Sequence, residues 1–134
     1  MKAFLFFLLI PIQIFAEHLY VINARYGEVS EYQLILSKID HSVIYFTQDG
    51  EKRAGVMPLN EFLLNWEKQD DFEAQSMPGQ YVSYIKSQTA YSEGPFDLIY
   101  PRYNQADETL IFTLKEKANQ PGKLGETTLF LTHE

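Results

Sequence analysis

Three histidines are the side chains best suited to metal binding or acid–base chemistry in this sequence: His18, His41 and His133. A zinc site typically draws ligands from short spacings such as His at i and i+4, and these three show none. The chain has no cysteine, so it has no disulfide, thiolate nucleophile or thiolate metal site. The sequence therefore predicts no metal and no other cofactor, with a site assembled from dispersed residues as the alternative.

Nucleophilic and carboxylate catalysis are also poorly indicated. The sequence contains no Gly-x-Ser-x-Gly motif and no glycine-rich phosphate loop. Ser42 follows His41 directly, but adjacent residues on a strand point to opposite faces. The acidic pair Asp107–Glu108 lies in a polar stretch, where nothing would raise a carboxyl pKa for acid catalysis. We expect a protein that is not an enzyme, and a hydrolase with a dispersed site is the alternative.

The turn Gln48–Gly55 is the first candidate for recognition. It carries Asp49, Lys52 and Arg53 and is expected to form a loop between a strand and a helix. Loops held on a β scaffold often contain binding residues. A solvated turn whose charges bind nothing is the alternative interpretation.

The corner Pro101-Arg102-Tyr103 is the second candidate. Arg102 would pair with a carboxylate, and Tyr103 would pack against a neighbouring loop. Ordinary packing at a corner of the structure explains the same residues without a ligand.

The first residues predict export. Lys2 gives a positive start, Ala3–Ile10 form an apolar segment, Pro11 interrupts it, and Ala16 is a small residue before polar Glu17. This order is typical of a signal peptide, and the apolar run is shorter than the roughly 20 residues of a spanning helix. We therefore predict a signal peptide over residues 1–16 and a periplasmic or secreted domain over 17–134, without stable membrane insertion. An uncleaved anchor and a buried first helix are the alternatives.

The charge balance narrows the class of partner. The chain has 18 acidic and 11 basic side chains, a formal net charge of -7. An acidic chain without a basic run repels phosphate backbones and anionic lipid, so we expect no nucleic-acid partner.

Small secreted eukaryotic domains usually depend on disulfides, so the absence of cysteine favours a bacterial envelope protein.

Alternating apolar and polar residues predict seven short strands. They are Leu19–Ala24, Tyr32–Ile39, Ser42–Thr47, Gln80–Gln88, Phe96–Tyr100, Thr109–Lys115 and Thr127–Thr132. We expect the second and third to form a hairpin around Asp40–His41. Pro101 is expected to end the fifth strand or to place it at a sheet edge.

One amphipathic helix is predicted over about residues 58–68. Pro58 suits a first helical position, and Leu59, Phe62, Leu63 and Trp66 follow at i, i+3, i+4 and i+7. We expect Trp66 in the core. These elements predict a mainly β protein: a single sandwich-like antiparallel domain of about seven strands with one helical insert.

A series of short motifs runs through the chain after residue 16. In order, they are Tyr45-Phe46-Thr47, Lys52 or Arg53, Gly55, Trp66, Phe72, Pro78, Pro101-Arg102-Tyr103, Thr109-Leu110-Ile111-Phe112-Thr113 and Leu129-Phe130. This order resembles an uncharacterised family of small exported, mostly bacterial proteins. The chain departs from that pattern at Gln48-Asp49-Gly50, where the family has Asp-Arg-Pro, and at Gly79-Gln80, where it has Asn-Ala. The resemblance implies export and a β-rich fold, and it implies no activity.

These observations predict a non-catalytic exported binding or accessory module of the bacterial cell envelope. It would act on a protein or glycan partner through a sheet face or edge, or through the Gln48–Gly55 loop. A small-molecule or lipid carrier is the alternative, beside the hydrolase named above.

Overall fold

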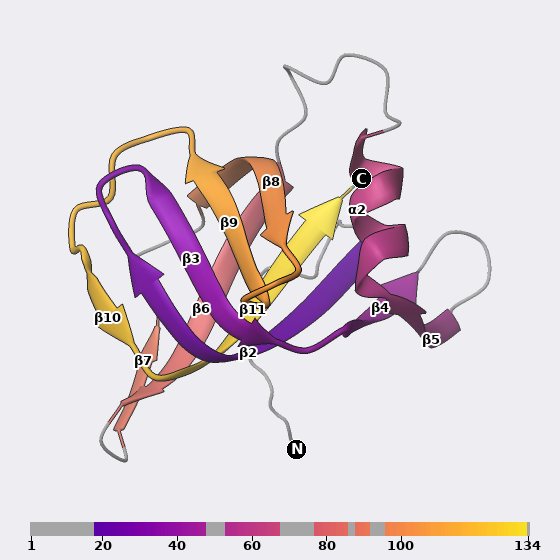
Figure 1. The fold of residues 1–134 in the computed structure, drawn as a ribbon, viewed down its shortest axis with the longest axis horizontal. Helices are drawn as coiled ribbons and strands as arrows, with labels where there is room; N and C mark the ends of the chain where they lie inside the picture. Colours follow the sequence, from indigo (N-terminus) through magenta and orange to yellow (C-terminus); the bar gives the residue numbers. More distant parts are fainter. Residues whose placement is uncertain (1–17, 48–52, 68–76, 86–87, 92–95, 134) are drawn as a thin grey trace.

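The computed structural model describes residues 18–47, 53–67, 77–85, 88–91 and 96–133, and these ranges form ten strands and one helix (Figure 1). The elements are β2 His18–Val29, β3 Gln33–Ile39, β4 Ser42–Thr47, β5 Arg53–Pro58, α2 Leu59–Glu67, β6 Met77–Ile85, β7 Gln88–Tyr91, β8 Phe96–Asn104, β9 Thr109–Leu114, β10 Gly122–Leu124 and β11 Glu126–His133. The predicted mainly β, sandwich-like antiparallel domain with one helix is confirmed.

The strands pair into a sheet that closes on itself. The order is β2–β3–β9–β8–β6–β11, and β11 then pairs again with β2. All of these pairings are antiparallel. Three further elements extend this ring: the β4–β5 hairpin and β10 pair with β2, and β7 pairs with β6. Figure 1 shows the ring strands wrapped around a shared interior.

Each of the seven predicted strands is present, and three short ones were missed. The missed strands are β5, β7 and β10. The sequence of β5, RAGVMP, includes Gly and Pro, and β10 has only three residues, beginning at Gly122. Residues of this kind are typical of turns, so such segments form strands only when a neighbouring strand supplies the hydrogen bonds.

The predicted hairpin between β3 and β4 is wrong. Both strands are antiparallel to β2, as the pairs Ala24↔Ile39 and Val21↔Ile44 show, so the chain continues in one direction. Between those pairs, four residues oppose two, which makes an irregular bulge with two extra residues at Asp40–Val43. The Asp40 amide donates to the Asn23 carbonyl at 2.8 Å, which keeps the chain beside β2 instead of reversing it.

Pro101 does not end the strand, as one of its two expected effects required. Strand β8 continues through Pro101 to Asn104 and pairs with both β6 and β9. The register shifts between Ile99 and Arg102, and Tyr100 has a φ of 50°. In the described ranges β6 pairs only with Phe96, Asp97 and Leu98, so the part of β8 around Pro101 has β9 alone as a neighbour, in agreement with the expected edge position. The bulge there also places the proline where no ladder hydrogen bond is required.

Helix α2 packs its apolar side against the inside of the sheet, and Trp66 is in the core as predicted. Trp66 is 1% exposed, and its ring lies 5.9 Å from that of Phe62 and 5.8 Å from that of Phe112. Phe62 in turn contacts Tyr20 of β2 at 4.9 Å between ring centroids. The Leu59 amide donates to the His41 carbonyl at 2.7 Å. This hydrogen bond holds the first residue of α2 against the bulge between β3 and β4.

The β4–β5 hairpin has two unlike faces. On the inner face Val43 is fully buried, and the Tyr45 ring covers Gly55 so closely that a Cβ there would lie 2.6 Å from the Tyr45 hydroxyl. On the outer face Phe46 is 43% and Val56 is 64% exposed.

No helix in the described ranges is both long and apolar enough to span a bilayer.

Candidate functional site

A groove of about 700 Å³ crosses the sheet where β3, β2, β11 and β6 run side by side. Three of its lining residues, Ala24, Ser83 and Thr127, are buried. The other lining residues of β2, β11 and β6 are more exposed and alternate with these buried positions, so the groove lies on the outer face. Each strand contributes two outward side chains. They are Lys38 of β3 with Asp40 just after that strand, Asn23 and Arg25 of β2, Glu126 and Thr128 of β11, and Val82 and Tyr84 of β6.

The strand register arranges these side chains in two rows. In the first row Tyr84 pairs with Glu126, and Arg25 and Lys38 continue the row on β2 and β3. This row therefore changes from an aromatic ring to a carboxylate and then to two cations. Tyr84 is 54% exposed, so one side of its ring is open to a ligand.

The second row is uncharged until its last member. Val82 pairs with Thr128, and Thr128 pairs with Asn23. The Thr128 hydroxyl donates to Asn23 Oδ1 at 2.8 Å, which fixes both side chains on the floor of the groove. Asp40 completes the row, held by its backbone bond to Asn23.

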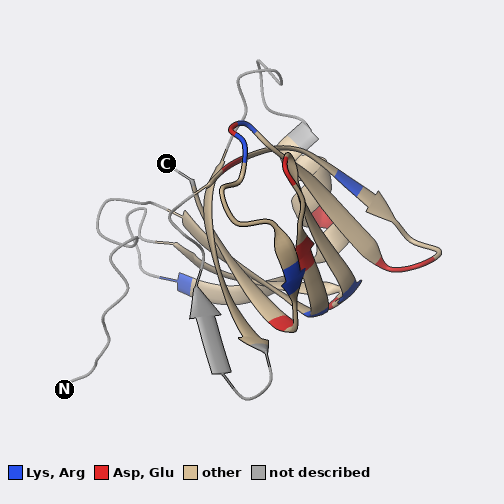
Figure 2. Ribbon diagram, turned by 90° about the vertical axis from the view of Figure 1, so that its left-hand side faces the viewer, with Lys and Arg blue, Asp and Glu red and all other residues tan. Residues whose placement is uncertain are grey.

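The groove is mixed in charge, with Arg25 and Lys38 opposed by Asp40 and Glu126. Figure 2 shows basic and acidic residues lying side by side on the ribbon instead of forming one large patch of either sign. With Tyr84 and Val82 at the β6 end, the groove offers an apolar surface at one end and hydrogen-bonding groups at the other. Its volume falls within the range of about 300–1,000 Å³ that is common for small-ligand sites.

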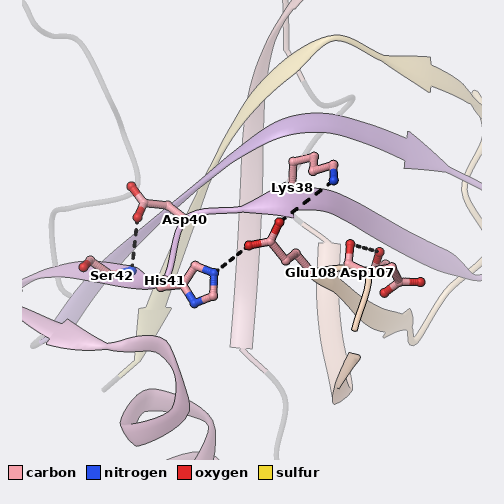
Figure 3. Close-up of polar contacts among 7 residues, drawn as sticks. Lys38, Asp40, His41, Ser42, Asp107 and Glu108 are labelled. Atoms are coloured by element: carbon pink, nitrogen blue, oxygen red, sulfur yellow. Dashed lines mark hydrogen bonds and ion pairs between the residues drawn. The ribbon is translucent and has the colours of Figure 1, made fainter. Parts of the chain in front are cut away.

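An ionic cluster adjoins the β3 end of the groove (Figure 3). His41 Nε2 lies 2.8 Å from Glu108 Oε2, and Lys38 Nζ lies 4.0 Å from Glu108 Oε1. The hydrogen bond with His41 lowers the pKa of the Glu108 carboxyl; desolvation opposes this, and the charges of His41 and Lys38 lower the pKa further. Lys38 therefore belongs both to the groove and to this cluster.

The backbone around this cluster adopts an uncommon conformation. Lys38 and Glu108 have φ values of 53° and 56°, in the left-handed region that residues other than glycine rarely occupy. The Ile39 amide donates to the Glu108 carbonyl at 3.2 Å and links the two positions. This geometry directs the side chains of Lys38 and Glu108 to the same corner of the sheet.

The residues of the predicted Gln48–Gly55 site are only partly described. Asp49 and Lys52 lie outside the described residues. Arg53 is exposed and begins β5, where it pairs with Thr47. The loop was therefore predicted too long, because the backbone of Arg53–Gly55 pairs with β4.

The second predicted site lies on β8. Arg102 is exposed and Tyr103 is half-buried, and as neighbours on a strand they point to opposite faces. Within the described part of the chain, Arg102 forms no ion pair. The Tyr103 ring stands edge-on to His41 at 6.5 Å, and its buried hydroxyl has no hydrogen-bond partner among the described residues.

The structure does not bring the two predicted sites together. Tyr103 lies beside His41, at the end of the β4–β5 hairpin where Ser42 pairs with Pro58. Arg53 pairs with Thr47 at the opposite end of the same hairpin.

Two of the three histidines considered as metal ligands lie on paired strands. The backbone of His18 pairs directly with that of His133 across β2 and β11, although the two are far apart in sequence. Among the described residues, no three histidine, aspartate or glutamate side chains gather as metal ligands would.

Ser83 and Lys86 have the Ser-x-x-Lys spacing found in some serine hydrolases. Lys86 lies outside the described residues. Ser83 is 1% exposed, and in the part of the chain that the structure describes its hydroxyl has no hydrogen-bond partner. Strand β6 therefore does not present this serine to a substrate as a nucleophile would require.

Sequence reasoning missed the groove entirely. Its residues come from strands more than 100 positions apart, as the 105-residue separation of Asn23 and Thr128 shows. The only indication in the sequence was local: polar Asn23 and Arg25 alternate with apolar Ile22 and Ala24. Such alternation shows that a strand has an outer face, and it does not show which other strands share it.

Comparisons with known proteins add no relative. No protein-family model matches the chain, and neither a curated protein nor a solved structure matches it significantly.

Proposed function

We propose that this chain is a non-catalytic, exported binding module of the bacterial cell envelope, and that the groove across β3, β2, β11 and β6 binds a glycan. The observation that carries the proposal is the composition of the groove. It combines the exposed ring of Tyr84 with hydrogen-bonding side chains held in two rows.

This composition suits the two surfaces of a sugar. The C–H face of a sugar ring is apolar and packs on aromatic side chains such as Tyr84. Its hydroxyls need both donors and acceptors, which Asn23 and Thr128 supply together with the carboxylates of Asp40 and Glu126. The groove spans three inter-strand spacings, roughly 14 Å, so it is long enough for more than one sugar ring.

The interior of the closed sheet favours a binding site on the outer surface over a carrier function. Large apolar side chains fill the interior, and all of those named here are less than 2% exposed: Ile22, Leu34, Leu36, Leu98, Leu110, Phe112, Leu114, Leu129 and Leu131. A lipid or small-molecule carrier needs an internal space of ligand size, whereas this interior is occupied by the protein's own side chains.

Titration of the full chain with a panel of neutral and acidic oligosaccharides tests the proposal, with affinity measured by calorimetry. We expect Tyr84→Ala to weaken binding about tenfold or more, because stacking on the ring is lost. Tyr26→Ala is the matched control, since Tyr26 is also 54% exposed but does not line the groove. Equal affinities for the two variants, or no binding of any sugar, would refute the glycan proposal.

Two further readings complete this test. Mass spectrometry of the sugars after incubation should find them intact if the module is non-catalytic, and cleaved products would support the hydrolase alternative. The mass of the protein recovered from its native cell should begin at Glu17 if residues 1–16 are a signal peptide.

A protein partner is the second candidate, favoured by the outer face of the β4–β5 hairpin. Ile44 pairs with Val56 and Phe46 with Ala54, so apolar side chains of both strands share this face. Within the described residues β5 pairs only with β4, which leaves its other edge open. An open edge beside exposed apolar side chains is suited to strand addition by another protein.

A further inference from the structure

The groove contains two cations that face each other on neighbouring strands. Arg25 and Lys38 lie opposite each other on β2 and β3, between the pairs Ala24↔Ile39 and Tyr26↔Ser37. Like charges at opposed positions of an antiparallel pair repel each other. An anion bound between them would remove that repulsion and accept hydrogen bonds from both side chains.

Among the residues that the structure describes, neither cation forms a close ion pair of hydrogen-bonding length. In the described part of the chain Arg25 forms no ion pair. Lys38 approaches Glu108 only at 4.0 Å, and the other oxygen of that carboxylate is engaged by His41 at 2.8 Å. Both cations therefore retain N–H donors for a ligand, in a chain whose net charge is -7.

We propose that the glycan is acidic and that its anionic group binds between Arg25 and Lys38 while a sugar ring stacks on Tyr84. This inference rests on the proposed function and specifies the class of its ligand. The first row of the groove sets the orientation, because Tyr84 stands at the β6 end and the two cations at the β2–β3 end.

The carboxylates in the groove limit the ligand further. Glu126 lies in the same row as the cations, and Asp40 lies at the end of the other row. They repel a polyanion such as polyphosphate or nucleic acid, but they accept hydrogen bonds from sugar hydroxyls. A ligand with one acidic group per sugar and several hydroxyls meets both requirements, so carboxylated sugars are the favoured class.

The test compares each acidic oligosaccharide with its own neutral form. The probes are trimers of galacturonic acid and a disaccharide of N-acetylglucosamine and N-acetylmuramic acid, each as the free acid and as the methyl ester. Inorganic phosphate is the third probe. We expect the full chain to bind at least one acid about tenfold more tightly than its ester, with the difference shrinking at high salt.

Three variants locate the anionic group. Arg25→Gln and Lys38→Gln should each weaken binding of the acid more than binding of the ester, so each should reduce the preference for the acid. Lys123→Gln is the matched control, because Lys123 is an exposed cation on β10 that does not line the groove. Circular dichroism of each variant verifies that the fold is intact.

The outcomes separate this inference from the proposed function. Equal binding of acid and ester would overturn the inference and leave glycan binding in place, and so would an acid preference that neither variant at Arg25 nor Lys38 changes. Phosphate binding as tight as that of the sugar acid would show a simple anion site and also overturn it. Failure of every sugar to bind would overturn both.

Discussion

Strand β2 has two faces that differ in burial and in the type of side chain they carry. Its inner face carries Ile22 and Ala24, which are buried in the core, whereas its outer face carries Asn23 and Arg25, which line the groove. The β4–β5 hairpin repeats the contrast, with Val43 buried inside and Val56 exposed outside. Side chains of the inner face therefore contribute mainly to folding stability, and side chains of the outer face are available for binding.

The largest expected effect comes from the inner side. Trp66→Ala should lower the free energy of unfolding by about 3–5 kcal/mol, because it leaves a cavity between Phe62 and Phe112. Urea denaturation followed by circular dichroism measures the loss. Leu64→Ala is the control on the same helix, since Leu64 is about half exposed, and it should change stability by about 0.5 kcal/mol or less. Similar losses for both variants would mean that α2 is not anchored through Trp66.

An intermediate effect is expected on the outer face of the β4–β5 hairpin. Val56→Arg should leave the unfolding free energy within about 0.5 kcal/mol of the original, because Val56 is 64% exposed. If a protein partner docks on this face, the charge should abolish cross-linking of that partner in the native cell. Leu64→Arg, on the exposed side of α2, should retain it. Retention of the partner by both variants would exclude this face as its docking site.

The smallest effect concerns the exposed ionic cluster of Lys38, His41 and Glu108 beside the bulge. The lowered pKa of Glu108 means that the folded protein favours its ionised form, mainly through the hydrogen bond with His41. The corresponding stabilisation is present above the ordinary carboxyl pKa and is lost as pH falls through the lower folded value.

Thermal unfolding measured from about pH 7 to about pH 3 tests this contribution, since glutamate ordinarily titrates near pH 4. The original protein should be slightly more stable than Glu108→Gln near neutrality, and the difference should vanish at the acid end. Glu31→Gln is a comparison at an exposed ion pair, because Glu31 lies 3.0 Å from Lys117 far from the bulge. If the difference in thermal stability between the original protein and Glu108→Gln stays constant with pH, the carboxylate charge of Glu108 does not contribute to folding stability.

Local patterns predicted the elements more reliably than their connections. The apolar spacing of Leu59, Phe62 and Trp66 identified α2 and its buried side, because helix periodicity is a property of one short segment. The β3–β4 hairpin was predicted wrongly, because two short strands separated by Asp40–His41 are compatible with either a turn or a bulge. The Asp40 bond to Asn23, a residue of another strand, decided between them.

The sequence alone determined that this protein has a β-rich fold with a core containing Trp66, since alternation and helical spacing specify which side of each element is apolar. The sequence also determined that the protein has no thiol chemistry, because the chain contains no cysteine. Only the tertiary structure decided which outer faces lie side by side. The meeting of Arg25, Lys38, Tyr84 and Glu126 depends on strand order and register, which long-range backbone pairing establishes and local sequence does not encode.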